Sequence, residues 1–280
     1  MLEKVDLTKK ISKEEYKAKM PQMEIELGRL QRECRELKIP VMIVFEGFGA
    51  SGKGVQIGKL IQSMDPRGFQ VFPVKAETEE ERMHPFLWRF WTKTPEAGRI
   101  AIFDGSWYRK VLIDRFEKRT REKEIETAFH SIEAFEKQLT DGGTILVKLL
   151  LDIDQKEQKK RFEKLLEKKE TAWRVSQGDR ERNAKYSEYA AMMEEVLYRS
   201  DTKSAPWTVI EATDRRFATV KIYMTVIHAL AEAVEAVQRR RMEEQAIKAA
   251  EQVSGQQEAA EIMRQAGGEL EMLQSSVLSR

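Results

Sequence analysis

A chain of 280 residues is long enough for one large α/β domain with an appendage, or for two small domains. Apolar residues make up 41% of it, which is sufficient for a proper core, and the 34% of charged residues favours long solvated helices. The formal net charge of +2 hides local segregation and does not identify a partner, although we expect neither nucleic acid nor a membrane. The single cysteine excludes a fold held together by disulfides.

The cellular compartment can be predicted from the same sequence. Cys34 fits a reducing environment, as a packed or half-exposed thiol on a helix. The N-terminus carries no apolar run of the signal-peptide type, and no apolar stretch approaches the roughly 18 residues of a membrane span. We therefore expect a cytoplasmic protein.

The first helix is predicted from Ser12 to about Lys38, after a short lead-in. Ser12 and Glu15 have the spacing of a capping box, and the segment that follows is highly charged. Pro21 falls inside this segment, and we expect it to kink or split the helix because proline cannot donate the intrahelical hydrogen bond.

A phosphate-binding loop is predicted in the stretch 41–54, VMIVFEGFGASGKG. An apolar β-branched run predicts a buried strand, and a helix is expected from Val55 to about Met64. Between them the sequence matches G-x-x-x-x-G-K-[ST], except that glycine replaces Ser or Thr. Small residues let backbone N–H groups surround an anion, and the lysine adds charge for the outer phosphates. The alternative is a glycine-rich turn with a surface lysine. The predicted phosphate-binding residues are Gly47, Gly52, Lys53 and Gly54.

A second strand is predicted at residues 69–75, and an aromatic segment follows at residues 76–93. This segment mixes acidic residues with aromatic ones, among them Trp88 and Trp91. One interpretation is an amphipathic helix that buries its rings. The alternative is a platform on which a nucleotide base stacks, with Arg89 nearby.

The third predicted strand, residues 99–104, ends in an acid. At the carboxyl end of a parallel strand beside a phosphate loop, Asp104 is placed to hold Mg²⁺, directly or through water. The alternative is that it only caps the strand. A predicted helix then brings basic side chains together, and Arg109, Lys110 and Arg115 are either phosphate contacts or an ordinary solvated face.

The second half of the chain continues the alternation of strands and helices. A helix is predicted at 124–140 and a nearly all-apolar fourth strand at 144–151, in which Lys148 is an exception that suggests a sheet edge. From residue 154 to 174 the chain is heavily basic, which suits either an anion-binding lid or a solvated helix. A fifth strand at 205–210 and a long helix at about 216–241 follow.

This order predicts an α/β fold: a parallel five-stranded sheet with helices on both faces, in three layers, and a helical lid. We expect a helical lead-in at residues 1–38, one domain at 39–241 with its lid at about 154–199, and a tail at 242–280. The tail is rich in Glu, Gln, Ala and Met, and is predicted to form exposed helices or a linker.

Six blocks of sequence, in order, resemble the polyphosphate kinase 2 family. They are FEGFGASGKG, DPRGFQV, TEEERMHPFLWRFW, IFDGSWYRKVLIDR, FEKQLTDGGTILVK and APWTVIEATDRR, and the similarity spans about residues 6–238. The resemblance implies a P-loop kinase-like domain that transfers phosphate between polyphosphate and a nucleotide, with Mg²⁺ and a basic lid. The sequence looks most like the polyphosphate:AMP phosphotransferase branch, and AMP or ADP remains open as the acceptor.

The resemblance also implies roles for individual residues. Lys53 matches the loop lysine that holds the transferred phosphate, Asp104 matches the metal ligand at the strand end, and Arg115 is counted with them as catalytic. Predicted contacts to polyphosphate or nucleotide are Lys110, Arg161, Lys164 and Arg174.

Two departures from the family pattern bear on activity. The loop of the family usually reads G-x-D-x-x-G-K-G, and Gly49 stands at the position of that acid. The third strand is usually followed by Arg-Ser-Trp-Tyr, and Gly105 replaces the arginine. Gly54 is normal for the family. Because phosphoryl transfer depends on positioning and charge neutralisation, losing one acid and one arginine is expected to slow turnover while phosphate binding persists.

The family includes proteins with two such domains in tandem, one of them commonly with a worn site. The segment VDLTKKISKEEY resembles a domain start and SSVLSR resembles the approach to another domain, so residues 242–280 are predicted to be an interdomain linker. Association with a second copy of the chain is the other expected partnership.

Three functions therefore compete. The first is an active polyphosphate-dependent nucleotide phosphotransferase, based on Lys53, Asp104 and the basic lid. The second is a non-catalytic domain that binds polyphosphate, a nucleotide or a partner, based on Gly49 and Gly105. An ATP-dependent nucleotide kinase shares the fold but explains the six blocks poorly.

Overall fold

The computed structural model describes the backbone of residues 2–278 and the side chains of residues 2–248 and of Arg264. Its centre is a parallel five-stranded sheet in the order β2-β3-β1-β4-β5. The strands are β1 (Val41–Gly47), β2 (Phe69–Pro73), β3 (Ile100–Asp104), β4 (Ile145–Asp152) and β5 (Trp207–Glu211). The α/β sheet predicted from the sequence is thus confirmed, with β1 in the middle.

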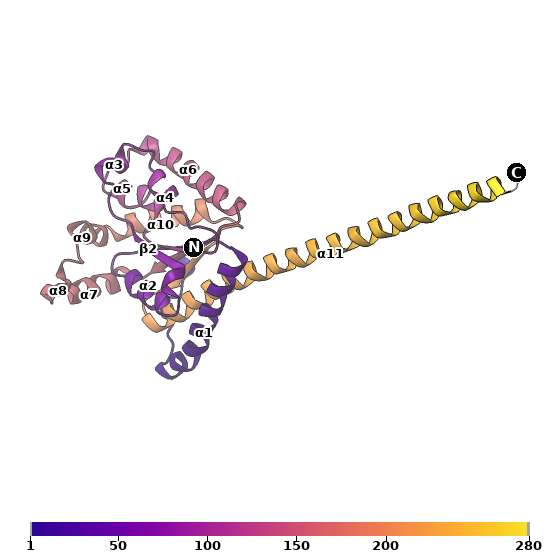
Figure 1. Cartoon of the computed structure of the whole chain (residues 1–280). Coiled ribbons are helices and arrows are strands. Elements are labelled where there is room, and N and C mark those ends of the chain that lie inside the picture. Colours follow the sequence, from indigo (N-terminus) through magenta and orange to yellow (C-terminus); the bar gives the residue numbers. More distant parts are fainter. Residues whose placement is uncertain (1, 279–280) are drawn as a thin grey trace. The chain divides into compact units, whose positions relative to one another are not determined.

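Helices cover both faces of this sheet (Figure 1). On one side lie α1 (Lys13–Leu37), α2 (Lys53–Gln62) and the first part of α11 (Arg215–Leu278), which are joined by hydrogen bonds from Lys59 to Tyr16 and Thr219. On the other lie α4 (Trp88–Trp91), α6 (Glu122–Asp141) and α10 (Tyr186–Ser200). Each face of a parallel sheet is apolar, so both need such cover.

The lid elements follow β4. They are α7 (Gln155–Leu166), α8 (Lys169–Ala172) and α9 (Gln177–Ala184). The remaining short helices are η1 (Leu2–Lys4), η2 (Pro66–Gly68), α3 (Glu79–Arg82), η3 (Trp107–Lys110) and α5 (Ile113–Phe116).

Several local predictions can be compared with these elements. The capping box of Ser12 and Glu15 is present at the start of α1. Pro21 lies inside α1, and the helix is not split there, contrary to one expectation. The aromatic segment forms two short helices, α3 and α4, with Pro85 between them, because a proline disfavours a helical residue before it.

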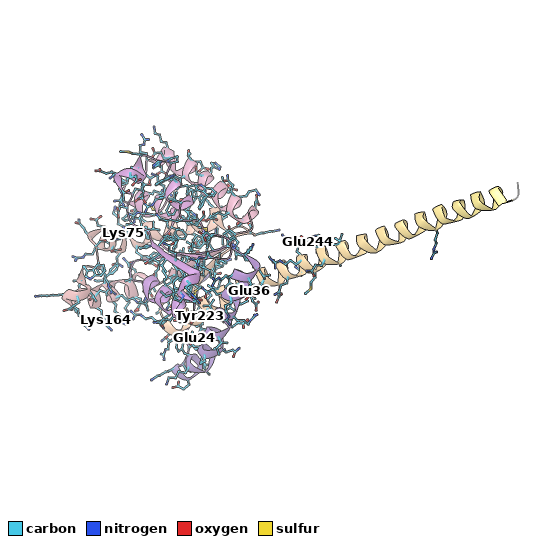
Figure 2. All side chains as sticks on the ribbon, in the orientation of Figure 1. Glu24, Glu36, Lys75, Lys164, Tyr223 and Glu244 are labelled. Atoms are coloured by element: carbon cyan, nitrogen blue, oxygen red, sulfur yellow. The ribbon has the colours of Figure 1, made fainter. Side chains whose placement is uncertain are left out.

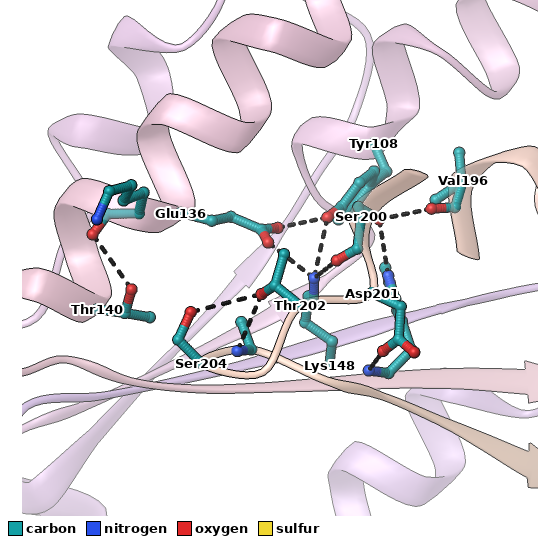
Figure 3. Close-up of polar contacts among 12 residues, drawn as sticks. Tyr108, Glu136, Thr140, Lys148, Val196, Ser200, Asp201, Thr202 and Ser204 are labelled. Atoms are coloured by element: carbon teal, nitrogen blue, oxygen red, sulfur yellow. Dashed lines mark hydrogen bonds and ion pairs between the residues drawn. The ribbon is translucent and has the colours of Figure 1, made fainter. Parts of the chain in front are cut away.

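The expectation that Lys148 marks a sheet edge is wrong. It lies in β4, between β1 and β5, and its side chain is fully buried. Its Nζ donates to Glu136 Oε2 at 2.7 Å, to the Ser200 carbonyl at 2.6 Å and to Tyr108 Oη at 3.3 Å (Figure 3). Burial lowers the pKa of Lys148, although Glu136 opposes that shift. A buried ammonium is tolerated here because each of its three donors has an acceptor.

The long helix α11 crosses the boundary between two compact units, one ending at Val234 and one beginning at Glu235. Among the described residues, Arg215–Lys248 contains an 18-residue window with a mean hydropathy of 1.3, apolar enough to pass a membrane-span test, and half of that window is buried in the protein. A stretch of this kind was not expected from the sequence. Its buried residues include Tyr223, Val226 and Leu230, so the apolar face serves the core.

Candidate phosphotransfer site

The loop after β1 has the backbone of an anion cradle. Gly47 has φ +132°, and a Cβ there would lie 2.2 Å from the Leu151 carbonyl oxygen, so only glycine fits between β1 and β4. Gly52 has φ +108° and caps the N-terminus of α2. The loop therefore turns sharply and presents the free N–H groups and positive dipole end of α2 to the site.

Lys53 begins α2 and lies along this loop. Its Nζ donates to the carbonyl oxygens of Gly47 at 2.8 Å and Phe48 at 3.3 Å. It forms no ion pair with any side chain that the structure describes. An ammonium has three donors, so one remains for a ligand oxygen. The lysine is thus held over the loop with one N–H donor and its positive charge available to a ligand.

Two acids stand at the adjoining ends of β1 and β3. The register pairs Phe45 with Asp104, which brings Glu46 next to that aspartate. Glu46 is buried and accepts a hydrogen bond from Ser106 Oγ at 2.7 Å. Burial raises its pKa, the Lys53 charge lowers it, and Asp104 adds repulsion. A Cβ on Gly54 would lie 3.9 Å from Asp104 Oδ2, so the start of α2 faces the same carboxylate.

A cavity of about 840 Å³ joins the loop to the lid. Its walls come from the loop and α2, from the end of β3, from α7 and α8, and from the start of α11. The lining residues are Ala50, Gly52, Lys53, Gly54, Val55, Asp104, Arg161, Lys164, Leu165, Lys168, Thr171, Trp173, Arg174 and Arg215. Six of these are basic and one is acidic, so the cavity is suited to a polyanion. Figure 2 labels Lys164, which lies on α7 in the lid.

Arg161 lines the cavity but is tied into the protein. Its guanidinium donates to the carbonyl oxygens of Ala50 and Ser51 in the loop and of Ala212 and Thr213 after β5, and its Nε donates to Glu157. The side chain is 8% exposed. Because its five donors all have acceptors, Arg161 anchors α7 to the loop, and the predicted substrate contact would compete with those bonds.

The lid also closes over Gly49. Gln158 donates to the Gly49 carbonyl at 3.1 Å, and a Cβ on Gly49 would lie 2.9 Å from Asp179 Oδ1 and 3.1 Å from Phe162 Cζ. Burial raises the pKa of Asp179, but hydrogen bonds from Ser176 and Arg182 outweigh it and lower the pKa overall. A lid carboxylate therefore stands beside the position where the loop acid of the family is missing.

The other predicted residues divide into two groups. Lys164 and Arg174 line the cavity with Lys53 and Asp104. Arg115, on α5, instead pairs with Glu195 at 2.5 Å and with Glu122 at 3.2 Å. Lys110 stands over the Phe86 ring at 5.9 Å and lines a separate cavity of about 10 Å³. The structure thus does not bring Arg115 and Lys110 to the loop.

The aromatic segment at residues 76–93 packs partly against the core. Trp91 meets Phe135 edge-on at 4.7 Å, and Phe90 meets Phe103 and Trp107. Phe90 is thus buried as one interpretation predicted, whereas Trp91 remains 40% exposed. Glu46 and Arg215 stand in the quoted sequence blocks but were given no role, Lys168 was counted only as part of the basic lid, and Trp173 was not predicted.

Fold and site together define the class of protein. A parallel sheet in the order β2-β3-β1-β4-β5, with a phosphate loop after β1, an acid at the end of β3 and a basic lid, is a P-loop kinase-like fold. The model of the family described as "Polyphosphate kinase 2 (PPK2)" matches residues 10–240. The chain belongs to the polyphosphate kinase 2 family.

Individual relatives agree with this membership. The chain is 36% identical to the polyphosphate:AMP phosphotransferase of Pseudomonas syringae pv. tomato, over 83% of this chain and 47% of that protein. A crystal structure of a polyphosphate kinase 2 from Pseudomonas aeruginosa superposes with a TM-score of 0.80 at 35% identity, covering 84% of this chain and 50% of the other. A crystal structure of polyphosphate kinase 2 from Arthrobacter aurescens superposes with a TM-score of 0.78 at 30% identity. The match covers 83% of this chain and 85% of the other. The chain thus spans about half the length of the polyphosphate:AMP phosphotransferases that it matches.

Proposed function

We propose that this chain transfers phosphate between inorganic polyphosphate and a nucleoside phosphate, AMP or ADP, with Mg²⁺. The observation that carries the proposal is the cavity in which the phosphate loop, Asp104 and the lid cations meet. The names of the relatives support this reaction class, and they refer to AMP, ADP and GDP. The acceptor preference is therefore not fixed by similarity.

The residues suit a loose transition state in which charge spreads over the phosphoryl oxygens. Backbone N–H groups of the loop bind the oxygens of the transferred group, and the free donor of Lys53 neutralises the charge that develops between donor and acceptor. Lys164 and Arg174 bind the rest of the polyanion. During transfer, a P–O bond to the polyphosphate breaks as a bond to the acceptor phosphate oxygen forms.

The acidic lining of the cavity allows Mg²⁺ to be held by a single carboxylate. No group of three or more His, Cys, Asp or Glu side chains that could hold a metal occurs among the described residues. Mg²⁺ is commonly held by one or two carboxylates, with water and phosphate oxygens completing its shell. Asp104, which lines the cavity, would supply that carboxylate, whereas Glu46 is buried and bonded to Ser106. When bound, the ion would offset phosphate charge.

The proposed activity is tested with purified protein, polyphosphate, Mg²⁺ and either AMP or ADP. We expect phosphorylated nucleotide from the unmodified chain and none above background from Lys53→Ala. Lys59→Ala is the matched control, because Lys59 also lies on α2 but bonds to Tyr16 and Thr219 instead of the loop. Product formation that survives Lys53→Ala would overturn the assignment.

A second candidate is a domain that binds polyphosphate or nucleotide without turning it over. Gly49 is the observation that favours it, since the loop carries no acid and the lid occupies the adjacent space. Equilibrium binding separates the two candidates: binding of polyphosphate that requires Lys53, without any nucleotide product, would support the second. Restoring the family residues at positions 49 and 105 is a poor test, since Gly105 has φ +74° and an added Cβ at Gly49 is crowded.

The setting remains a proposal as well. We propose that the protein works in the cytoplasm, with Cys34 as a free, buried thiol. Burial raises the pKa of that thiol to about 11, so it stays protonated and unreactive at neutral pH.

A further inference from the structure

The wall of the cavity is chemically mixed. Its lining combines the phosphate loop and six basic residues with three apolar side chains, those of Val55, Leu165 and Trp173. Inorganic polyphosphate has no apolar part, so a site built for it alone gains nothing from such side chains. A ligand that is anionic at one end and aromatic at the other would use both kinds of lining residue.

Trp173 is the most exposed of these three apolar side chains. Its side chain is 76% exposed, which is unusual for the largest apolar side chain and leaves ring surface open to solvent. Its orientation is fixed locally, because the indole N–H donates to the Glu170 carbonyl at 2.8 Å. The Arg174 guanidinium lies 5.4 Å from the ring centroid and lines the same cavity.

The other tryptophans do not offer this surface to the cavity. Trp107 and Trp207 are buried, Trp88 stacks on His84 at 4.0 Å, and Trp91 packs against Phe135. Residues 76–93, where the sequence suggested a base-stacking platform, do not line this cavity. An exposed indole that lines the phosphate-binding cavity lies in the lid instead.

We propose that Trp173 is a stacking platform for the base of a nucleotide whose phosphates lie toward the Lys53 end of the cavity. A ring held by its own N–H and bordered by a cation offers a π-face that any base can use, so the contact gives affinity with little base selectivity. The inference rests on the proposed function, since it places the nucleoside part of that substrate.

The test compares two ligands that share phosphates but differ in the base. Dissociation constants for ADP and for inorganic tripolyphosphate are measured by calorimetry with the full chain and with Trp173→Ala. We expect ADP to bind roughly five- to hundredfold more weakly to the variant, which is the range for losing one base–aromatic stack. Tripolyphosphate should bind within about twofold of the unmodified chain, because no phosphate contact is removed.

Two further variants make the result specific. Trp173→Phe keeps a ring and should retain most of the ADP affinity. Tyr198→Ala removes an aromatic side chain of similar exposure, 83%, that does not line the cavity, and should change neither constant. Thermal melting checks that all variants are folded.

The outcomes are distinguishable. An ADP constant unchanged by Trp173→Ala overturns the inference and leaves the proposed function standing. An equal loss for ADP and tripolyphosphate also overturns it, since Trp173 would then only shape the lid. If the unmodified chain binds tripolyphosphate but no nucleotide, the nucleotide part of the proposed function fails, and this inference with it.

Discussion

Two lysines of this protein, one buried inside the sheet and one at the phosphate loop, differ in whether a donor is left for a ligand. Lys148, in the middle of β4, is fully buried, and its ammonium donates to Glu136, Tyr108 and Ser200. Lys53, after β1, is half-exposed and donates only to two loop carbonyls. The first has no donor left for a ligand, and the second has one.

The surroundings of the two lysines differ in the same way. Glu136 also accepts from Tyr108 Oη (Figure 3) and from Trp107 Nε1 at 2.9 Å, so every polar group around Lys148 is bonded within the protein. Around Lys53 the cations line an open cavity of about 840 Å³ and largely lack acidic partners there. A polar network whose members are all bonded to one another stabilises the fold. Positive charges that face a cavity without acidic partners can instead bind a polyanion.

The largest expected effect tests the closed network. Lys148→Met leaves the Glu136 carboxylate buried without its cation, so we expect a loss of about 3–5 kcal/mol in the free energy of unfolding. Adding Glu136→Gln removes the stranded charge and keeps an acceptor for Trp107 and Tyr108, so it should recover part of the loss. Urea denaturation of both variants measures this. If Lys148→Met alone were as stable as the unmodified chain, the Lys148 network would not stabilise the fold.

Lys53→Met tests the open site. Loss of the loop charge removes stabilisation of the transferred phosphate, and we expect phosphate transfer to fall by about a hundredfold or more, or about 3 kcal/mol of barrier. Stability should change little, within about 0.5 kcal/mol, because the lysine is half-exposed. Initial rates and urea curves on one protein preparation separate the two effects. Equal losses of activity and stability would mean that Lys53 is structural.

Much of the fold could be predicted from the sequence, because the signals were local. Apolar β-branched runs placed all five strands, and the glycines at 47 and 52 placed the loop. The position of Lys148 could not be read in this way, since its acceptors come from residues 108, 136 and 200. A lone lysine in an apolar strand gives no indication of partners so distant in the chain.

The site was predicted from two signals: residues close in sequence to a strand end, and the basic lid, from which Lys164 and Arg174 reach the cavity. Lys53 and Asp104 both lie in the cavity, as the strand–loop–helix pattern implied. Arg161 and Arg115 carry the charge expected of ligand contacts, but their donors are already used within the protein. Arg161 donates to backbone carbonyls of distant elements, and Arg115 pairs with Glu195. Composition cannot distinguish a basic side chain that faces a cavity from one that anchors a helix.

Asp152 is a buried charge that, unlike Lys148, has no partner of opposite charge among the described residues. It ends β4, is 3% exposed and forms no ion pair with the residues described. Burial raises its pKa from 3.8 to about 6, with added repulsion from Asp154 and Glu211. Its stabilising contribution is thus complete below about pH 3.8 and is lost as the pH rises through 6. Asp152→Asn should therefore gain about 2 kcal/mol more stability at pH 8 than at pH 4. Urea curves at the two pH values measure it; a pH-independent difference would contradict the assignment.

The smallest expected effect concerns the contact between lid and loop. An added methyl at Gly49 would meet Asp179 Oδ1 at 2.9 Å and Phe162 Cζ at 3.1 Å, so Gly49→Ala must push the lid away. Overpacking of this kind costs about 1–3 kcal/mol, and we expect the lower end because Asp179 lies on a short lid helix. Limited proteolysis should cut within residues 155–184 faster than in the unmodified chain. Gly58→Ala, a matched change on α2 with open space around the new methyl, should leave the rate unchanged. Equal protection of the lid in both variants would show that Gly49 is not what lets the lid close over the loop.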